Sequence, residues 1–168
     1  MPTGKPSYTA AVITVSDSCS NGTRKDLSGP AIAETLKQRG FEVVHTQIVP
    51  DNQSQIEQAI TAACDKARLV ITTGGTGAAP SDVTPEATMA VCKRMLPGVA
   101  ERMRAQGIQK TPLASLSRSV CGIHGTSLVL NLPGSPAGAT DSFLAVVGLM
   151  AHALELLAGN TEHKATAK

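Results

Sequence analysis

Residues 68–87 read RLVITTGGTGAAPSDVTPEA, and three structural signals follow one another in them. Residues 68–73 form a short apolar run of the kind that makes a buried strand. Glycines at 74, 75 and 77 then interrupt the pattern. Thr84-Pro85-Glu86 combines a capping residue, a first-turn proline and an acid, which together indicate a helix start. The stretch therefore predicts a strand, a glycine-rich loop and a helix that runs to about Met95.

Alternating strand and helix patterns extend in both directions from this stretch, which predicts an α/β fold. Further strands are expected at residues 8–15, 41–49, 117–123 and 127–132, the last two as a hairpin around His124-Gly125. Further helices are expected from Ser28 to about 39, from Asp51 or Asn52 to about 66, at 99–106 and at 137–157. One domain at 8–159 is expected, with a disordered segment at 1–7 and a flexible tail at 160–168.

The composition excludes several classes of protein. Of the 168 residues, 42 % are hydrophobic and 17 % are charged, which argues against a mainly disordered chain. The net charge of +2 comes without a basic stripe interleaved with aromatics, so a nucleic-acid partner is not expected. We find no secretory signal and expect no membrane span, because the apolar run at 143–158 is short and interrupted by polar residues. The four separated cysteines have no metal-binding spacing and indicate a cytoplasmic protein with reduced thiols.

The glycine-rich loop is a candidate anion site. Gly74, Gly75 and Gly77 let the backbone approach a ligand and turn N–H groups toward it, and the helix start beyond them also favours an anion. The loop lacks the Gly-Lys-Ser/Thr ending of a Walker A loop. A tight strand-to-helix connection without a ligand explains the same residues.

Two acids follow strands at the same expected edge of the sheet. Asp82 lies between the glycine-rich loop and the helix, and Asp51 follows the second strand. Magnesium is usually bound by one or two carboxylates together with substrate phosphates, so this pair is a candidate Mg²⁺ site. Helix capping and an Asx turn are the structural alternatives for both residues.

Ligands in open α/β sheets bind at the carboxyl ends of the strands. The loops at 16–28, 50–51, 74–84 and 133–136 all follow expected strands, so they are candidates for one shared site. Ser16, Asp17 and Asp26 are turn residues when they are taken alone. Ser135 is either an ordinary helix N-cap or an anion-binding hydroxyl.

Several ordered motifs resemble those of a known family. They are TVSDS at 14–18, DLSGP at 26–30, VPD at 49–51, TGGTG at 73–77, DVTPEA at 82–87, LSR at 116–118 and NLPGSP at 131–136. Together they resemble the molybdopterin-binding family that includes bacterial MogA and MoaB and the G domain of gephyrin. The resemblance covers residues 8–159. It implies a three-layer α/β fold with a mostly parallel sheet, and a homotrimer.

The resemblance also implies an activity: transfer of AMP from Mg-ATP to molybdopterin in molybdenum cofactor biosynthesis, with pyrophosphate released. Asp51 and Asp82 match the family's two functional aspartates, which would act in catalysis and hold Mg²⁺. The glycine-rich loop, Gly74, Gly75, Thr76 and Gly77, matches the phosphate-contacting loop. The matching substrate-contacting residues are Ser16, Asp17, Asp26, Pro133, Gly134, Ser135 and Pro136. A molybdenum-insertion enzyme is a candidate partner.

Two positions depart from the family pattern. Ser81 stands where many relatives carry Arg, and Gly107 stands where the adenylyltransferase relatives tend to have Ser. They favour, as the alternative, a MoaB-like protein that binds molybdopterin with weak or no catalysis. A hydrolase of nucleotide pyrophosphates, as in CinA-type domains, is a third hypothesis, and it is disfavoured because such proteins normally carry a second domain.

Overall fold

A computed structural model describes residues 8–161 of the chain. The disordered segment predicted at 1–7 and residues 162–168 of the predicted tail lie outside this range. The described part is an α/β domain built on one six-stranded sheet. This confirms the predicted fold class.

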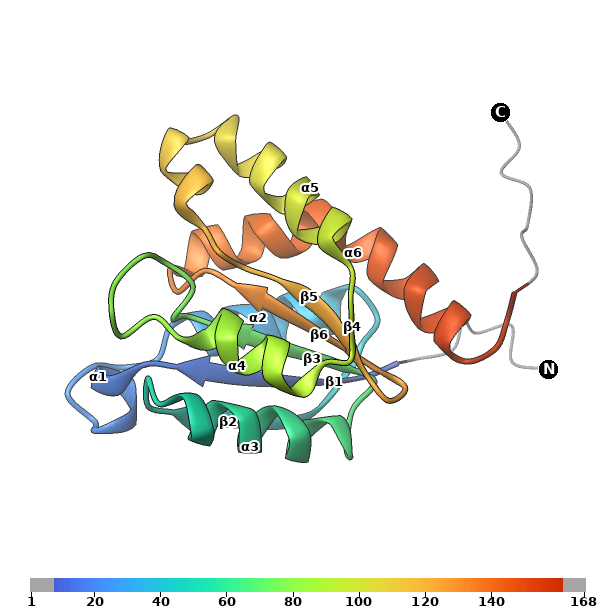
Figure 1. The fold of residues 1–168 in the computed structure, drawn as a ribbon, viewed down its shortest axis with the longest axis horizontal. Helices are drawn as coiled ribbons and strands as arrows, with labels where there is room; N and C mark the ends of the chain where they lie inside the picture. The colour runs from blue at the N-terminus through green and yellow to red at the C-terminus, as the bar shows by residue number, and fades with distance from the viewer. Residues whose placement is uncertain (1–7, 162–168) are drawn as a thin grey trace.

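The sheet has the strand order β2-β1-β3-β6-β5-β4 (Figure 1). Strands β1, β2, β3 and β6 run parallel, whereas β5 and β4 continue the sheet antiparallel beyond β6. The carboxyl ends of the four parallel strands therefore meet at one edge. The strands are β1 (Thr9–Val15), β2 (Glu42–Val49), β3 (Leu69–Thr73), β4 (Arg94–Met95), β5 (Cys121–His124) and β6 (Ser127–Leu132).

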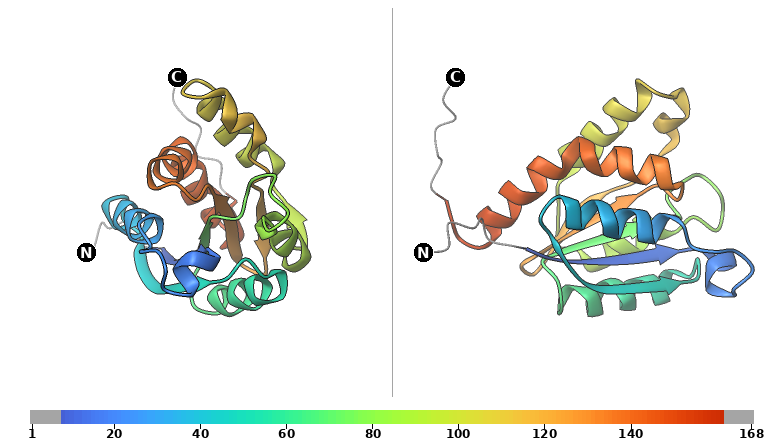
Figure 2. Two further views of the ribbon diagram at one scale, coloured as in Figure 1. Left: turned by 90° about the vertical axis from the view of Figure 1, so that its left-hand side faces the viewer. Right: turned by 180° about the vertical axis from the view of Figure 1, so that it is seen from behind.

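Helices cover both faces of the sheet and complete three layers (Figures 1 and 2). Side chains of α2, α5 and α6 pack with Val12 and Leu69 in one core, and side chains of α3 and α4 pack with Ile13 and Val70 in the other. The helices are α1 (Asp17–Ser20), α2 (Ser28–Gln38), α3 (Gln53–Cys64), α4 (Thr84–Val91), α5 (Pro97–Ile108) and α6 (Pro136–Leu157), and η1 (Pro112–Leu116) is a 3₁₀ helix.

Helix α6 has 22 residues and is, by length and composition alone, apolar enough to cross a membrane. One stripe of it is instead buried against the sheet, with Phe143 and Met150 fully enclosed and Phe41 in edge contact with the Phe143 ring. Burial of this stripe removes apolar surface from water, which accounts for the composition of the helix. We therefore describe α6 as a core helix.

The predicted boundaries are wrong between Val91 and Val120. Helix α4 ends at Val91 rather than near Met95, because Lys93 donates to the Ile123 carbonyl and Arg94–Met95 pair with β5. Helix α5 begins at Pro97, whose missing N–H is tolerated in a first turn. Strand β5 begins at Cys121 rather than at Ser117, because the Arg118 N–H donates to the Thr76 carbonyl outside the sheet.

The predicted caps are partly confirmed. Asn52 and Ser135 cap α3 and α6 through their side-chain oxygens, as expected. Ser28 and Thr84 are not caps but the first residues of α2 and α4, and at α2 the Asp26 carboxylate accepts the Gly29 N–H instead. Helix α1 was not expected, since it is a single turn capped by Ser16 inside the predicted loop.

Candidate active site

The carboxyl ends of β1, β2, β3 and β6 enclose an open cavity of about 320 Å³, which we call the strand-end cavity. It lies at the left-hand edge of the sheet in Figure 1, beside α1. Four of the predicted loops meet here, as the parallel topology requires. Its lining includes Ser16, Asp17, Asp51, Gly74, Gly75, Asp82 and Gly134 from the predicted site, together with Val15, Ser18 and Arg24.

A second cavity, of about 500 Å³, shares Arg24 and Gly134 with the first, and we call it the adjoining cavity. It lies between the loop after α1 and the first turn of α6. Its remaining lining is Cys19, Lys25, Asp26, Leu27, Ser28, Ser135 and Pro136. A third cavity, of about 540 Å³, lies between α5, η1 and α6, and its wall includes Pro133, Ser135 and Gly107.

The glycine-rich loop contains two positions that only glycine can occupy without strain. Gly74 and Gly75 have φ of 101° and 65°, in the region that L side chains rarely adopt. A Cβ on Gly74 would lie 2.3 Å from the Val15 carbonyl oxygen, and one on Gly75 would lie 2.4 Å from Thr84 Oγ1. The Thr84 hydroxyl donates to the Gly74 carbonyl at 2.9 Å, which fixes the loop on the first turn of α4.

Asp17 and Asp51 are joined by reciprocal hydrogen bonds. The Asp17 N–H donates to Asp51 Oδ2 at 3.0 Å, and the Asp51 N–H donates to Asp17 Oδ1 at 2.9 Å. Burial raises the pKa of Asp51, and the nearby Asp17 and Asp82 carboxylates raise it further, against the lowering effect of the Asp17 N–H. Negative charge is therefore concentrated here, and a cation bound at this point would relieve the repulsion.

Asp82 is fixed by hydrogen bonds within its own loop. Its Oδ2 accepts the Ala79 N–H at 3.0 Å, and its N–H donates to the Ala79 carbonyl at 2.9 Å. A Cβ on Gly77 would lie 2.8 Å from the same Oδ2, so this glycine leaves room for the carboxylate. The Asp82 side chain thus bonds backward to Ala79 and does not form the predicted Asx turn, while the residue lines the cavity.

Arg118 fastens this loop to α4 and was not predicted as a site residue. Its Nε donates to the Gly77 carbonyl at 2.7 Å and its Nη2 donates to the Asp82 carbonyl at 2.6 Å. Its guanidinium also pairs with the Glu86 carboxylate, which lowers the pKa of Glu86. Bidentate contacts of this kind fix geometry as well as charge.

Several predicted site residues also have structural partners. Ser16 caps α1 and Ser135 caps α6 through their hydroxyls. Asp26 accepts from Thr14 Oγ1 at 2.7 Å and from the Gly29 N–H at 3.0 Å, while it lines the adjoining cavity. Thr76 is only 6 % exposed, and neither it nor Gly77 lines a cavity described above.

The donor set at the strand-end cavity fits Mg²⁺. Asp51 and Asp82 offer carboxylate oxygens, which are the ligands that this cation prefers. No group of three or more His, Cys, Asp and Glu side chains within residues 8–161 could hold a metal by itself. A cation here would therefore complete its coordination with water or substrate phosphates.

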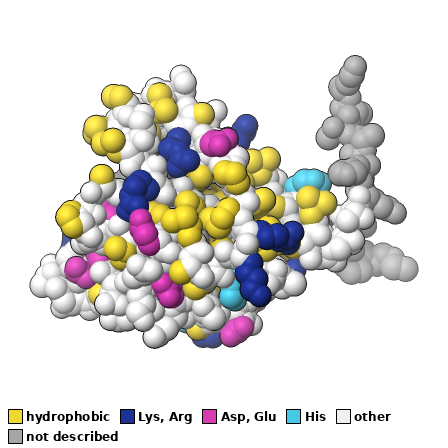
Figure 3. Space-filling model, viewed as in Figure 1, with side chains coloured by type: hydrophobic (Ala, Val, Ile, Leu, Met, Phe, Trp, Pro, Cys, Tyr) yellow, Lys and Arg dark blue, Asp and Glu magenta, His cyan; other side chains and the backbone are white. Residues whose placement is uncertain are grey.

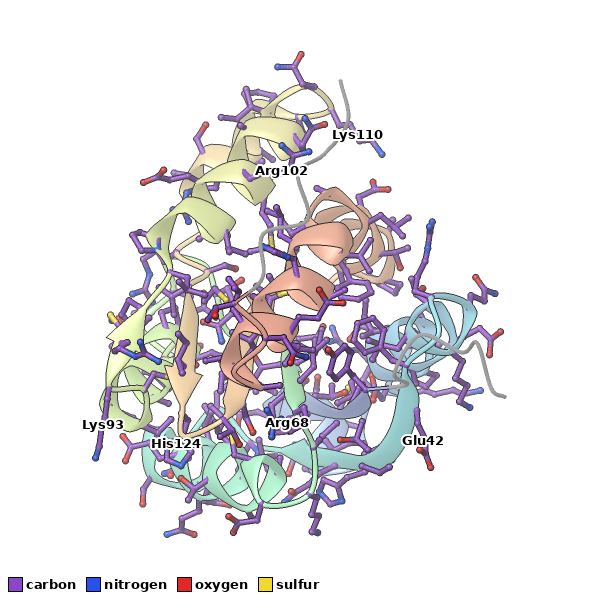
Figure 4. All side chains as sticks on the ribbon, turned by 90° about the vertical axis from the view of Figure 1, so that its right-hand side faces the viewer. Glu42, Arg68, Lys93, Arg102, Lys110 and His124 are labelled. Carbon is purple, nitrogen blue, oxygen red and sulfur yellow. The ribbon has the colours of Figure 1, made fainter. Side chains whose placement is uncertain are left out.

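The opposite end of the sheet carries no part of this arrangement (Figure 4). His124 lies there in the β5–β6 hairpin, and its Nδ1 is 2.6 Å from the Val91 carbonyl oxygen. This contact joins the β5–β6 hairpin to the C-terminal end of α4.

Comparison with known proteins places the chain in a family. The sequence model of a family described as "Probable molybdopterin binding domain" matches residues 11–152. The chain belongs to this family. It is 42 % identical over 153 residues to a molybdopterin adenylyltransferase of Helicobacter pylori strain J99, with 89 % of this chain and 87 % of the relative covered.

Solved structures agree with this assignment. The molybdopterin biosynthesis enzyme MoaB from Thermus thermophilus is 45 % identical with a TM-score of 0.85, covering 90 % of this chain and 97 % of that chain. A molybdopterin biosynthesis Mog protein from Mycobacterium ulcerans is 39 % identical with a TM-score of 0.85, covering 92 % and 99 %. The family resemblance expected from the sequence motifs is thus confirmed.

Proposed function

We propose that this protein is a molybdopterin adenylyltransferase, which transfers AMP from Mg-ATP to molybdopterin in molybdenum cofactor biosynthesis. The observation that carries the proposal is the strand-end cavity, where Asp51 and Asp82 lie beside the glycine-rich loop. Its support from relatives is the 42 % identity to the Helicobacter pylori adenylyltransferase over 89 % of the chain.

The reaction needs alignment and charge neutralisation rather than a protein nucleophile. A phosphate oxygen of molybdopterin forms a bond to the α-phosphorus of ATP, and the bond from that phosphorus to the bridging oxygen breaks, releasing pyrophosphate. Gly74 and Gly75 line the strand-end cavity without side chains, so phosphates can approach the backbone of the glycine-rich loop closely, and α4 begins behind this loop. Asp51 and Asp82 would hold Mg²⁺, which when bound neutralises phosphate charge.

The two adjacent cavities suit two polyanionic substrates. We assign Mg-ATP phosphates to the strand-end cavity and the molybdopterin phosphate to the adjoining cavity, where Ser135 and the start of α6 lie. Gly134 lines both cavities, so we place the transfer of AMP next to this residue. Ser16 and Asp17 line the strand-end cavity, and Asp26 and Pro136 line the adjoining cavity, so they are assigned to substrate contacts on the same basis. Pro133 lines the third cavity and is assigned to substrate contact by the family resemblance of its motif.

The location, oligomeric state and partner of the enzyme are also inferred. We infer a cytoplasmic homotrimer that passes its product to a molybdenum-insertion enzyme. This assembly rests on the family resemblance of the motifs around the site.

The first test is turnover of purified protein with molybdopterin and Mg-ATP, with adenylylated pterin and pyrophosphate measured by chromatography. Asp82→Asn should lower kcat by about 10²- to 10³-fold, because it removes a carboxylate proposed to hold the Mg²⁺ that neutralises the reacting phosphates. Asp65→Asn is the matched control, since Asp65 is exposed at the far end of α3. Unchanged turnover in Asp82→Asn would remove Asp82 from the proposed mechanism.

The alternative is a MoaB-like protein that binds molybdopterin without efficient transfer. It is favoured by the 45 % identity to the Thermus thermophilus MoaB and by Gly107, whose added Cβ would lie 2.8 Å from the Ala114 Cβ in the wall of the third cavity. Tight pterin binding by the wild-type protein without product would establish this alternative.

A further inference from the structure

The charges around the strand-end cavity are unbalanced. Three carboxylates, Asp17, Asp51 and Asp82, line it, and Arg24 is the one basic side chain in that lining among residues 8–161. Under the proposed function the cavity receives phosphates, which carry further negative charge. A fixed cation is therefore needed at this position in addition to any bound metal.

The backbone that carries Arg24 is well fixed. Its N–H donates to the Ser18 carbonyl at 3.0 Å, and the preceding Thr23 donates from both its N–H and its hydroxyl to Asn21 Oδ1. Hydrogen bonds from two successive residues therefore fix this loop on α1 and its C-cap. Such anchoring limits the conformational entropy lost when the side chain meets a ligand.

The guanidinium of Arg24 is free to bind. It forms no hydrogen bond or ion pair with any other side chain or carbonyl in the described part of the chain, and the residue is exposed. Arg102, Arg104 and Arg118 differ, because their guanidinium groups donate to backbone carbonyls within the fold. Arg24 thus keeps five N–H donors available in the fork that matches phosphate oxygens.

Arg24 lies where the two cavities join. It lines both of them, whereas Lys25 lines only the adjoining cavity. Asp26, the acid in the lining of the adjoining cavity, accepts only from neutral donors, the Thr14 hydroxyl and the Gly29 N–H, which do not cancel its charge. Arg24 and Lys25 outnumber this carboxylate, so the adjoining cavity has a net positive lining and the strand-end cavity a net negative one, with Arg24 at their boundary.

We propose that Arg24 is a substrate-binding catalytic residue that bridges the attacking phosphate of the pterin and the α-phosphoryl group of ATP. Lys25 contacts only the pterin phosphate. Arg24 stays protonated throughout: the phosphate oxygen of the pterin forms the new bond to phosphorus, and the electron pair of the broken bond leaves with pyrophosphate. This inference rests on the proposed function.

The test compares Arg24→Gln, Arg24→Lys, Lys25→Gln and, as a control, Arg39→Gln at the exposed end of α2. Arg24→Gln should lower kcat by about 10²-fold and weaken both substrates, and Arg24→Lys should recover part of the loss because it keeps the charge but not the fork. Lys25→Gln should raise KM for molybdopterin and leave kcat and KM for ATP near the wild-type values. A kcat of Arg24→Gln equal to that of Arg39→Gln overturns the inference.

Binding of AMP, which carries the α-phosphoryl group, separates this inference from the proposed function when it is measured by calorimetry with Mg²⁺. If the wild-type protein has no turnover but binds AMP, weaker AMP binding by Arg24→Gln and not by Arg39→Gln supports a phosphate-binding role for Arg24 while the transferase proposal fails. Equal AMP binding by both variants overturns that role.

Discussion

Gly75 shows how a single residue can link the backbone to the site. Its φ of 65° would strain any side chain, and an added Cβ would meet Thr84 Oγ1 at 2.4 Å and Asp51 Oδ1 at 3.1 Å. The first contact would push on the start of α4, and the second would push on the carboxylate proposed to hold Mg²⁺. Both stability and activity therefore depend on the absence of a side chain at Gly75.

We predict that Gly75→Ala destabilises the protein by about 2–4 kcal/mol and lowers turnover, because it adds backbone strain and a steric clash. Gly125→Ala is the matched control, since Gly125 also has positive φ but no atom lies within 4 Å of its added Cβ. It should cost only about 1 kcal/mol. Urea denaturation of both variants measures the difference, and equal losses would contradict the proposed clash.

Asp51 should lower the stability of the protein at neutral pH. Its folded pKa lies above the ordinary value of 3.8, chiefly because the carboxyl is buried. The folded state thus holds this proton more tightly than the unfolded state does, so stability falls as pH rises through the folded pKa. We predict that Asp51→Asn loses turnover but melts at a higher temperature than wild type at pH 7, and that this advantage disappears below pH 3.8.

Mg²⁺ provides the control for this pH effect. If Asp51 holds the cation, added Mg²⁺ with pyrophosphate should raise the melting temperature of the wild type more than that of Asp51→Asn. Equal shifts in the two proteins would argue against Asp51 as a ligand.

The site residues that sequence could predict are those with local signals. Gly74, Gly75 and Asp82 lie in one stretch with recognisable spacing, and Asp51 follows a strand. Arg24 has no such signal, because its role depends on the contact between the loop after β1 and the loop after β6. Arg118 was recognised only as part of a motif, since its three partners lie 32 to 41 residues away in the chain.

At the scale of elements, Arg118 couples the loop after β3 to the start of α4. The Arg118–Glu86 pair is partly exposed, with each side chain at 39 % relative accessibility, so solvent screens it. Loss of the arginine would also release the carbonyls of Gly77 and Asp82. Loss of Arg118 should therefore disturb the conformation of the loop more than it lowers the free energy of unfolding of the protein.

We predict a coupling of about 1 kcal/mol between Arg118 and Glu86 in a double-mutant cycle of Arg118→Met and Glu86→Gln. Because the pKa of Glu86 is lowered by its bond to Arg118, the contribution should be present above the unfolded pKa and lost as pH falls through the folded pKa. Urea denaturation at several pH values tests this, and additive effects at neutral pH would contradict it.

The elements themselves were predictable where hydrophobic periodicity was strong. The strand-loop-helix order around residues 68–87 was correct because a buried apolar strand, three glycines and a proline are strong local signals. The end of α4 was mispredicted because residues 92–95 have no breaking residue, and pairing with β5 decides their conformation. Tertiary hydrogen bonds of this kind cannot be read from local spacing.

At the scale of the whole molecule, α5 and η1 project from the domain and expose apolar side chains (Figure 3). Leu113 and Leu116 are 70 % and 62 % exposed, and Ile108 and Leu144 nearby are also exposed. Arg102 and Lys110 fix this projection on α6, through the Ala145 carbonyl and Asp141. A projection with an apolar tip is suited to contact another subunit in the proposed homotrimer.

We predict that Leu113→Asp combined with Leu116→Asp converts the trimer to monomers, because charges would have to be buried at the contact. The monomer should keep the fold, since neither leucine is buried within one chain. Met89→Asp is the control, because Met89 is 48 % exposed on α4 in the other helical layer. Light scattering measures the mass and circular dichroism the fold. A trimer that survives the double substitution would place the contact elsewhere, and a monomeric wild type would remove the homotrimer from the proposal.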